Sequence, residues 1–364
     1  GSSAFADCTA LTSVGNLTNV TTLGTCAFNS CKALKTIGDL SKVTSIGYST
    51  FGFCTALESV GNMSSVTSID SYAFEGCSSL VRVGNMSNVE SIDSNGFVNC
   101  SALEHVDELD KITSIGQYAF MGWTALKSIG SLHNLETIGQ GAFSGCSALE
   151  HVDDLYSLTR LEYDVFSHCV SLISVDCSDK LTAIGSSAFF GCKALVSIGD
   201  LSNVTSIESS VFRGCIALKS IGNMPKLESI GMQCFMGCTA LETVGDLSSL
   251  KEIPSETFDG CTSLVSIGDL SNVTIIGSYG FNQCKKLTSI PNLGSLERVD
   301  QFAFSGCESL ALLGNLRKLT SFGYSPFVNS PFHNCPNLVL EVLPDSAAEQ
   351  YAKDYNMQYT YITE

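Results

Sequence analysis

The sequence predicts a β-rich solenoid whose 23-residue coils stack through parallel β-ladders and end in a small α/β C-terminal cap. Three observations support this fold class: a Phe recurs every 23 residues, apolar residues fall at every third position between them, and the period breaks near the C-terminus. A fixed period of this length marks a solenoid, because each repeat buries its apolar face only against its neighbours. The recurring residues, which mark about fourteen coils, are Phe5, Phe28, Phe51, Phe74, Phe97, Phe120, Phe143, Phe166, Phe189, Phe212, Phe235, Phe258, Phe281 and Phe304.

The interior of each coil follows from the spacing of its apolar residues. With each recurring Phe counted as position 0, apolar residues occupy positions 3, 6, 9, 12, 15 and 18, and a small residue occupies position 22. Cys31, Leu34 and Ile37 begin this series after Phe28. A spacing of three matches neither an α-helix nor an alternating strand. We therefore expect a backbone that winds once per repeat and points every third side chain to the axis.

Two stretches of each coil, at positions 5–9 and 14–18, are expected to be strands because they are rich in β-branched residues. Gly often follows each stretch, as at Gly38 and Gly47, which suits corners that need an unusual φ. Stacked at about 4.8 Å per coil, the strands would form two parallel ladders in a rod or shallow arc about 70 Å long.

The end of the chain departs from the repeat and predicts a cap. Val339–Leu343 is typical of a strand, and Ser346 and Glu349 have the spacing of a capping box at the start of a short helix. Tyr359–Ile362 is typical of a closing strand. Solenoids need such an element to shield the last apolar layer.

We place a domain boundary between a solenoid at 1–326, whose N-terminal cap is missing, and a terminal repeat with its cap at 327–364. The chain opens in the middle of a repeat, before Phe5, so we expect it to be a fragment of a longer protein. Its uncapped N-terminal end would offer a surface for self-association.

The repeat resembles the BspA-like, or Treponema-type, leucine-rich repeat. The resemblance is carried by segments such as Cys54-Thr55-Ala56-Leu57 and by Ile276-Gly277 leading to Phe281, and it covers essentially the whole chain. One departure is Gly199-Asp200-Leu201, where the family often has Leu-Pro. The resemblance implies a leucine-rich-repeat solenoid and a cell-surface or secreted microbial protein that contacts host proteins, epithelia or other cells.

Composition excludes several classes of partner. The formal net charge is −17, which disfavours binding to nucleic acid or to anionic lipid. No apolar run approaches the length of about 18 residues that a membrane span requires, so we expect no direct membrane insertion.

The 17 cysteines are expected to be structural and reduced. Thirteen occupy position 3 of successive coils, and Trp123 takes that position once. A position that accepts Trp is a buried apolar one, where free Cys acts as a small hydrophobe. Parallel Cβ vectors in a stacked column do not converge, so we predict neither disulfides nor a metal site there.

Nothing in the sequence indicates an enzyme, a cofactor or a resident metal. His105 and His151 share position 8 but lie two coils apart, about 10 Å, which is too far for one metal ion. No Ser, His and acidic residue converge as a catalytic triad requires. Position 11 is mostly Asn or Asp, which predicts side-chain bonds to the backbone of neighbouring turns. The alternative is calcium, shared by carboxylates one coil apart such as Asp246 and Asp269.

Exposed aromatic residues are the best indication of a binding surface. Tyrosines two or three residues before the recurring Phe should line one edge of the solenoid: Tyr48, Tyr72, Tyr118, Tyr163, Tyr279 and Tyr324. Tyr suits recognition surfaces, although packing over a corner would also explain it. The strand face at positions 7 and 8, which includes Lys127 and Lys219, would suit a polar partner or a glycan.

The sequence therefore predicts a non-enzymatic, adhesin-like binding protein at the cell surface or outside the cell, with a host or neighbouring-cell protein or glycan as its partner. Weak contacts on successive coils can sum along a repetitive surface. Two other functions remain open: a structural spacer or assembly subunit that displays another domain, and the receptor-binding arm of a phage.

Overall fold

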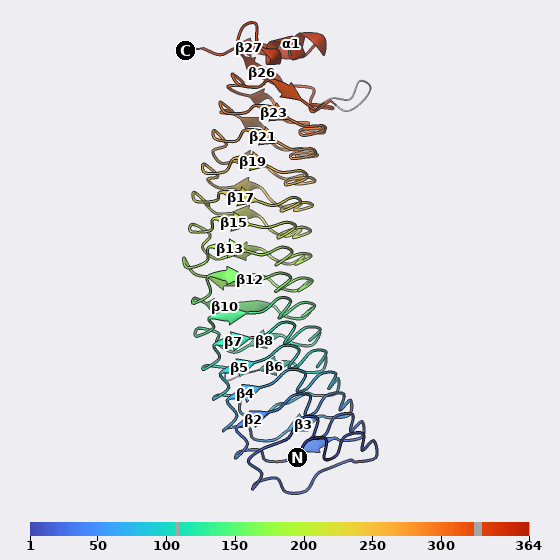
Figure 1. Ribbon diagram of the computed structural model, residues 1–364. Helices are drawn as coiled ribbons and strands as arrows, with labels where there is room; N and C mark the ends of the chain where they lie inside the picture. Colours follow the sequence, from blue (N-terminus) through green and yellow to red (C-terminus); the bar gives the residue numbers. More distant parts are fainter. Residues whose placement is uncertain (107–108, 324–329, 364) are drawn as a thin grey trace. The chain divides into compact units, whose positions relative to one another are not determined.

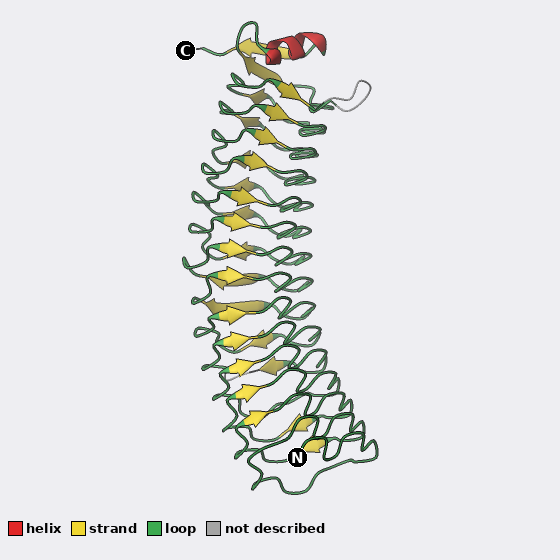
Figure 2. Ribbon diagram, in the orientation of Figure 1, coloured by secondary structure: helices red, strands yellow, loops and turns green. Residues whose placement is uncertain are grey.

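The computed structural model describes residues 1–106, 109–323 and 330–363. The chain forms two compact units, Gly1–Lys180 and Leu181–Glu364. Within each unit the backbone winds through successive coils that present short strands at two places and connect them by turns (Figures 1 and 2). The predicted parallel-strand solenoid with 23-residue coils is confirmed. The predicted domain boundary between residues 326 and 327 lies outside the described residues.

The first ladder is built from positions 8 and 9 of each coil. In the first unit its strands are β1 Thr36–Ile37, β3 Ser59–Val60, β6 His105–Val106, β8 Ser128–Ile129, β10 His151–Leu155 and β12 Ser174–Cys177. In the second unit they are β14 Ser197–Ile198, β16 Ser220–Ile221, β18 Thr243–Val244, β20 Ser266–Ile267, β22 Ser289–Ile290 and β24 Leu312–Leu313.

The second ladder is built from positions 17 and 18. In the first unit its strands are β2 Ser45–Ile46, β4 Ser68–Ile69, β5 Ser91–Ile92, β7 Ser114–Ile115, β9 Thr137–Ile138 and β11 Arg160–Leu161. In the second unit they are β13 Ala183–Ile184, β15 Ser206–Ile207, β17 Ser229–Ile230, β19 Glu252–Ile253, β21 Ile275–Ile276, β23 Arg298–Val299 and β25 Ser321–Phe322. Pairing is parallel and steps by one repeat, as in Ser45↔Ser68.

Most strands are shorter than the sequence predicts, because only the two residues at the end of each expected stretch pair as a ladder. Among the described strands of the two ladders before the cap, the long exceptions are β10 and β12, which carry Asp153 and Asp176 at position 10, where most other coils have Gly. Gly at this position permits a close approach of neighbouring backbones, since a Cβ on Gly61 would lie 2.5 Å from the Gly38 carbonyl oxygen.

The recurring Phe lies in a tight turn that is bonded to the next coil. The Phe51 N–H donates to the Ala73 carbonyl at 2.8 Å, and the Cys54 N–H donates back to the Phe51 carbonyl at 3.1 Å. Residues at positions 21 and 2, such as Ser49 and Phe53, have φ of 49° and 58°. Of these two left-handed residues, Phe53 is exposed and Ser49 is buried.

The core is a stack of repeated side chains. Neighbouring Phe rings of the first unit lie 4.7 to 6.1 Å apart between centroids, as in the pairs Phe74–Phe97 and Phe97–Phe120. In the second unit the pair Phe189–Phe212 is 5.5 Å apart with nearly parallel planes. Each buried ring contributes roughly 1.5–3 kcal/mol by leaving water.

The predicted cap is present in the second unit and consists of β26 Val339–Val342, α1 Ala347–Asp354 and β27 Gln358–Tyr361 (Figure 1). β26 extends the first ladder by pairing with β24, and β27 pairs with β26. Ser346 is the helix N-cap and accepts a hydrogen bond from the Glu349 N–H, as the capping-box spacing predicts.

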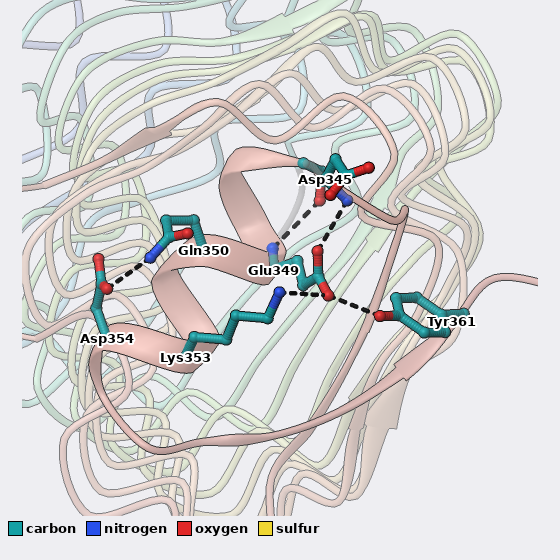
Figure 3. A network of polar contacts seen from close by, with 7 residues as sticks. Asp345, Glu349, Gln350, Lys353, Asp354 and Tyr361 are labelled. Carbon is teal, nitrogen blue, oxygen red and sulfur yellow. Dashed lines mark hydrogen bonds and ion pairs between the residues drawn. The ribbon is translucent and has the colours of Figure 1, made fainter.

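Glu349 is buried, with 3% of its surface exposed, and its carboxylate organises the cap (Figure 3). It accepts hydrogen bonds from the Asp345 N–H at 2.8 Å and the Tyr361 hydroxyl at 2.7 Å, and it pairs with the Lys353 ammonium at 2.8 Å. The bond to Lys353, then those to Tyr361 and to the Asp345 backbone, lower the pKa of Glu349 to about 2. The carboxylate therefore stays charged at neutral pH and ties α1 to β27.

Candidate binding surface

Four of the six predicted tyrosines lie on one edge of the first unit, which we call the tyrosine edge: Tyr48, Tyr72, Tyr118 and Tyr163. They occupy positions 20 and 21, in the turn that joins the second ladder to the next Phe. Tyr48 and Tyr163 are 48% and 43% exposed, and Tyr72 and Tyr118 are half-buried. Within the described part of the chain, none of their four hydroxyls has a hydrogen-bond partner. The edge therefore presents aromatic surface and free hydroxyls to solvent.

The backbone fixes where these rings point. Tyr118 donates its N–H to the Gln140 carbonyl of the next coil at 2.9 Å, and Tyr72 donates to the Ser94 carbonyl at 3.2 Å. Both tyrosines have left-handed backbones, with φ of 61° at Tyr72 and 53° at Tyr118. Bulky residues rarely adopt this conformation, which costs roughly 1–2 kcal/mol relative to the right-handed one. The same left-handed backbone recurs at position 21 of other coils, as at Ser49, where a small polar residue fills it with less strain.

Ring contacts along the edge are few. The Tyr48 and Tyr72 rings meet edge to face with centroids 5.5 Å apart. The Tyr118 ring lies against Gly141, where an added Cβ would come within 2.5 Å of two ring carbons. Gly141 also has a φ of +60°. The absence of a side chain therefore both permits the left-handed turn and leaves room for the Tyr118 ring.

The groups between the tyrosines are amides, hydroxyls and carboxylates. Asn95, Gln117 and Gln140 occupy the same two positions in neighbouring coils. Asp70 and Asp93 precede them at position 19, and burial, together with the Asp93 charge, raises the pKa of the Asp70 carboxyl. No Lys or Arg occurs in the edge turns at 47–53, 70–76, 93–99, 116–122, 139–145 or 162–168. The edge is therefore aromatic, hydrogen-bonding and negative.

The two remaining tyrosines are not part of this edge. Tyr279 belongs to the second unit, is 37% exposed and stacks on Phe302 with centroids 5.0 Å apart. The sequence prediction missed Phe302, although it lies at position 21 of the next coil and the same rule would have found it. Tyr324 lies outside the described residues.

The two predicted lysines lie at position 7, directly before the first-ladder strands β8 and β16. Lys127 pairs with Glu104 of the preceding coil at 3.2 Å, but both side chains are more than half exposed, so the ion pair contributes little stability. Glu104 also lines an open cavity of about 560 Å³ together with Arg82 and His105. Lys219 is exposed in the second unit. The lysines and the tyrosine edge occupy different faces of the coil.

The cysteine column has a role that sequence reasoning missed. Thiols at position 3 donate a hydrogen bond to the carbonyl of the Phe in the preceding coil, as from Cys54 to Phe28 at 3.1 Å and from Cys215 to Phe189 at 3.2 Å. Trp123 keeps this bond with its indole N–H. The position thus selects a buried group with one donor, which is why Trp replaces Cys and why apolarity alone does not explain the column.

All 17 cysteines are free thiols. Burial raises the pKa of the Cys54 thiol to about 12, and burial also raises that of Cys238 to about 12, so both stay protonated. At the C-terminal end of the column, a hydrogen bond with Cys307 lowers the pKa of Cys335, which is only partly buried.

Other polar columns have structural partners. Asp269 accepts a hydrogen bond from the Ser271 N–H at 2.8 Å, and this bond to the residue two positions on recurs along position 11. Bonds to a neighbouring coil are fewer, as from the Asp246 N–H to Asn223 at 3.0 Å. The expected bonding to backbone is present, but mainly within a coil. Among the described residues, no three His, Cys, Asp or Glu side chains are grouped so as to hold a metal ion.

Among the described residues, no helix is long enough and apolar enough to cross a membrane.

Comparison with known proteins identifies the repeat. A model of the BspA type leucine rich repeat region (6 copies) matches residues 1–127, 113–242 and 228–338. A solved leucine-rich repeat protein from Bacteroides ovatus is 28% identical, with a TM-score of 0.79, over 94% of this chain and 88% of that one. A leucine rich cell surface protein from Faecalibacterium prausnitzii is 31% identical, with a TM-score of 0.48, over 74% of this chain and 75% of that one. No curated protein matches the chain.

Proposed function

This chain belongs to the BspA-type leucine-rich repeat family, and from that premise we propose that it is a non-enzymatic, adhesin-like binding protein at the cell surface or outside the cell. Proteins of this family are cell-surface repeat proteins, which is consistent with a binding role. Its partner would be a surface protein or a glycan of a host or a neighbouring cell.

The tyrosine edge is the observation that carries the proposal. Interior positions are fixed by packing, since Phe, Cys and the apolar columns are buried in coil after coil. Positions 20 and 21 are not fixed in this way, because different coils hold residues as unlike as Ser, Asn, Gln, Glu, Met, Gly and Tyr there. Exposed Tyr at such positions supplies rigid, amphipathic contact area at low entropic cost. We include Lys127 and Lys219 in the same proposal, as residues of the strand face that would make polar contacts with the partner.

A cell-binding experiment tests the proposal. The labelled chain is titrated onto cultured epithelial cells and onto bacterial cells, with and without an excess of unlabelled chain. Saturable, competed binding is expected. Absence of saturable binding to either cell type, together with filaments seen by electron microscopy, would instead support an assembly subunit.

A further inference from the structure

The tyrosine edge has a spacing that a ligand can match. Tyr72 and Tyr118 lie 46 residues, or two coils, apart, and Tyr163 lies nearly two coils further along. Two coils correspond to about 10 Å along the ladder. The coils between them carry Asn95 and Gly141 at the corresponding position. Along the edge, a Tyr ring therefore alternates with an amide side chain or with a Gly that has no side chain.

The chemistry of the edge suits a polyhydroxylated ligand. A Tyr ring offers a flat face to the C–H side of a sugar ring, and its hydroxyl remains available as donor and acceptor. Asn95, Gln117 and Gln140 each offer both donors and acceptors beside the rings. Sugar hydroxyls need both kinds of group, whereas an apolar peptide would leave these amides without partners.

The charge of the edge selects among such ligands. Asp70 and Asp93 lie at position 19, and their turns contain no Lys or Arg to offset them. Glu162 holds the same position in a later coil, but it pairs with Arg160 at 3.1 Å. Carboxylates on a sugar or phosphates on a polymer would be repelled. An anionic ligand is therefore disfavoured, whereas a neutral one meets no repulsion.

Backbone strain supports the same conclusion. Tyr72 and Tyr118 adopt a left-handed φ that Asn adopts at Asn95 and Gly at Gly141 with little cost. The same left-handed backbone recurs at position 21 of other coils, as at Ser210, so the repeat requires the conformation but not a bulky ring. A half-exposed Tyr that forms no side-chain hydrogen bond there is available for a role outside the fold itself.

We propose that the tyrosine edge binds an extended, neutral, β-1,4-linked glycan that runs along the coils and stacks alternate sugars on Tyr72, Tyr118 and Tyr163. Successive rings of such a chain are turned over relative to one another, so the same face recurs at every second sugar. A pyranose unit is similar in length to the rise of one coil, so the two periods coincide. This inference rests on the proposed binding function and adds its ligand class.

The test uses calorimetric titration of the full chain with three neutral hexasaccharides: cellohexaose and chitohexaose, which are β-1,4-linked, and maltohexaose, which is α-1,4-linked and curved. Two variants come from the same coil and have similar exposure, Tyr163→Ala on the edge and Tyr156→Ala away from it, at 43% and 45% exposed. Binding to at least one β-1,4-linked chain is expected, with roughly tenfold loss in Tyr163→Ala and no loss in Tyr156→Ala.

The inference is overturned if neither β-1,4-linked chain binds, if maltohexaose binds equally well, or if both variants bind alike. Binding of a cationic peptide in the same calorimetric titration, with no binding of the glycans, would also overturn it. The same samples are applied to cells. Saturable cell binding by the chain without glycan binding leaves the proposed function standing and removes only the glycan, whereas absence of cell binding removes the proposed function.

Discussion

Tyrosines gather in two regions of this protein, and the structure uses them in opposite ways. In the cap of the second unit, Tyr351 stacks on Phe322 with centroids 3.9 Å apart and contacts the Ser330 hydroxyl at 3.0 Å, while Tyr361 donates to Glu349. On the tyrosine edge of the first unit the hydroxyls have no partner among the described residues, and Tyr118 packs on a Gly.

The difference shows how to separate structural tyrosines from candidates for recognition. A cap closes a solenoid once, so its groups must be satisfied by specific partners rather than by repetition. An edge position recurs in every coil and tolerates many residues, so a Tyr there needs another explanation. If the comparison is right, cap variants lose stability and edge variants lose binding.

The largest effect is expected at Tyr351. Tyr351→Ala removes a ring that stacks on Phe322 and Tyr355, and it is expected to destabilise the cap by roughly 2–4 kcal/mol, somewhat less than for a fully buried ring. Urea unfolding followed by tyrosine fluorescence measures the loss. Tyr355→Ala, whose ring is about half exposed, serves as the control and should cost less.

Glu349 is expected to make the cap sensitive to acid. Its pKa is held at about 2, below its usual value of 4.5, so its contribution is complete above pH 4.5 and is lost as the pH falls toward 2. Glu349→Gln should weaken the cap at neutral pH and abolish this dependence, and the two proteins should converge near pH 2. Near-ultraviolet circular dichroism between pH 2 and 7 measures this. An unchanged acid transition in Glu349→Gln would contradict the assignment.

A smaller effect is expected at Gly141 on the edge. Gly141→Ala combines a left-handed φ with a clash against the Tyr118 ring, and it should cost about 1–2 kcal/mol. Gly145→Ala has a similar φ of +74°, but its Cβ would meet nothing closer than 3.8 Å, so it measures the backbone cost alone. Adding Tyr118→Asn should remove the difference between the two Gly variants in urea unfolding. A persistent difference would show that the ring is not its cause.

The smallest effect on stability is expected for the edge tyrosines themselves. Tyr118→Asn introduces a residue that tolerates a left-handed φ, as Asn95 does at the same position of the preceding coil. The change in unfolding free energy should therefore stay within about 0.5 kcal/mol. Thermal melts measure this. A loss of 2 kcal/mol or more, on the scale of about 1–3 kcal/mol typical of structural sites, would mean that Tyr118 serves packing.

Much of this architecture could be predicted from the sequence, because a strict period constrains every buried position at once. The apolar columns, the parallel ladders and the capping box at Ser346 follow from spacing alone. Strand length did not follow, because the spacing is the same in every coil whereas, among the described strands of the 23-residue coils, only β10 and β12 continue through position 10, at Asp153 and Asp176.

The site was less accessible to prediction. Spacing placed the tyrosines on an edge, but it could not show that Tyr118 rests on Gly141 or that Tyr72 and Tyr118 hold left-handed backbones. The hydrogen bond from Cys to the Phe carbonyl was missed because a thiol and a small hydrophobe look alike in a sequence. Trp123, the one substitution in that column, carried the missing signal through its N–H.

Whether the edge tyrosines serve binding and not folding is best decided by measuring both stability and binding of one protein, the triple variant Tyr72→Asn, Tyr118→Asn and Tyr163→Ser. Each change installs a residue that the same position carries in another coil. We expect an unfolding free energy within about 1 kcal/mol of that of the original chain and complete loss of glycan binding in calorimetry. Loss of several kcal/mol of stability, or retained binding in the triple variant, would contradict it.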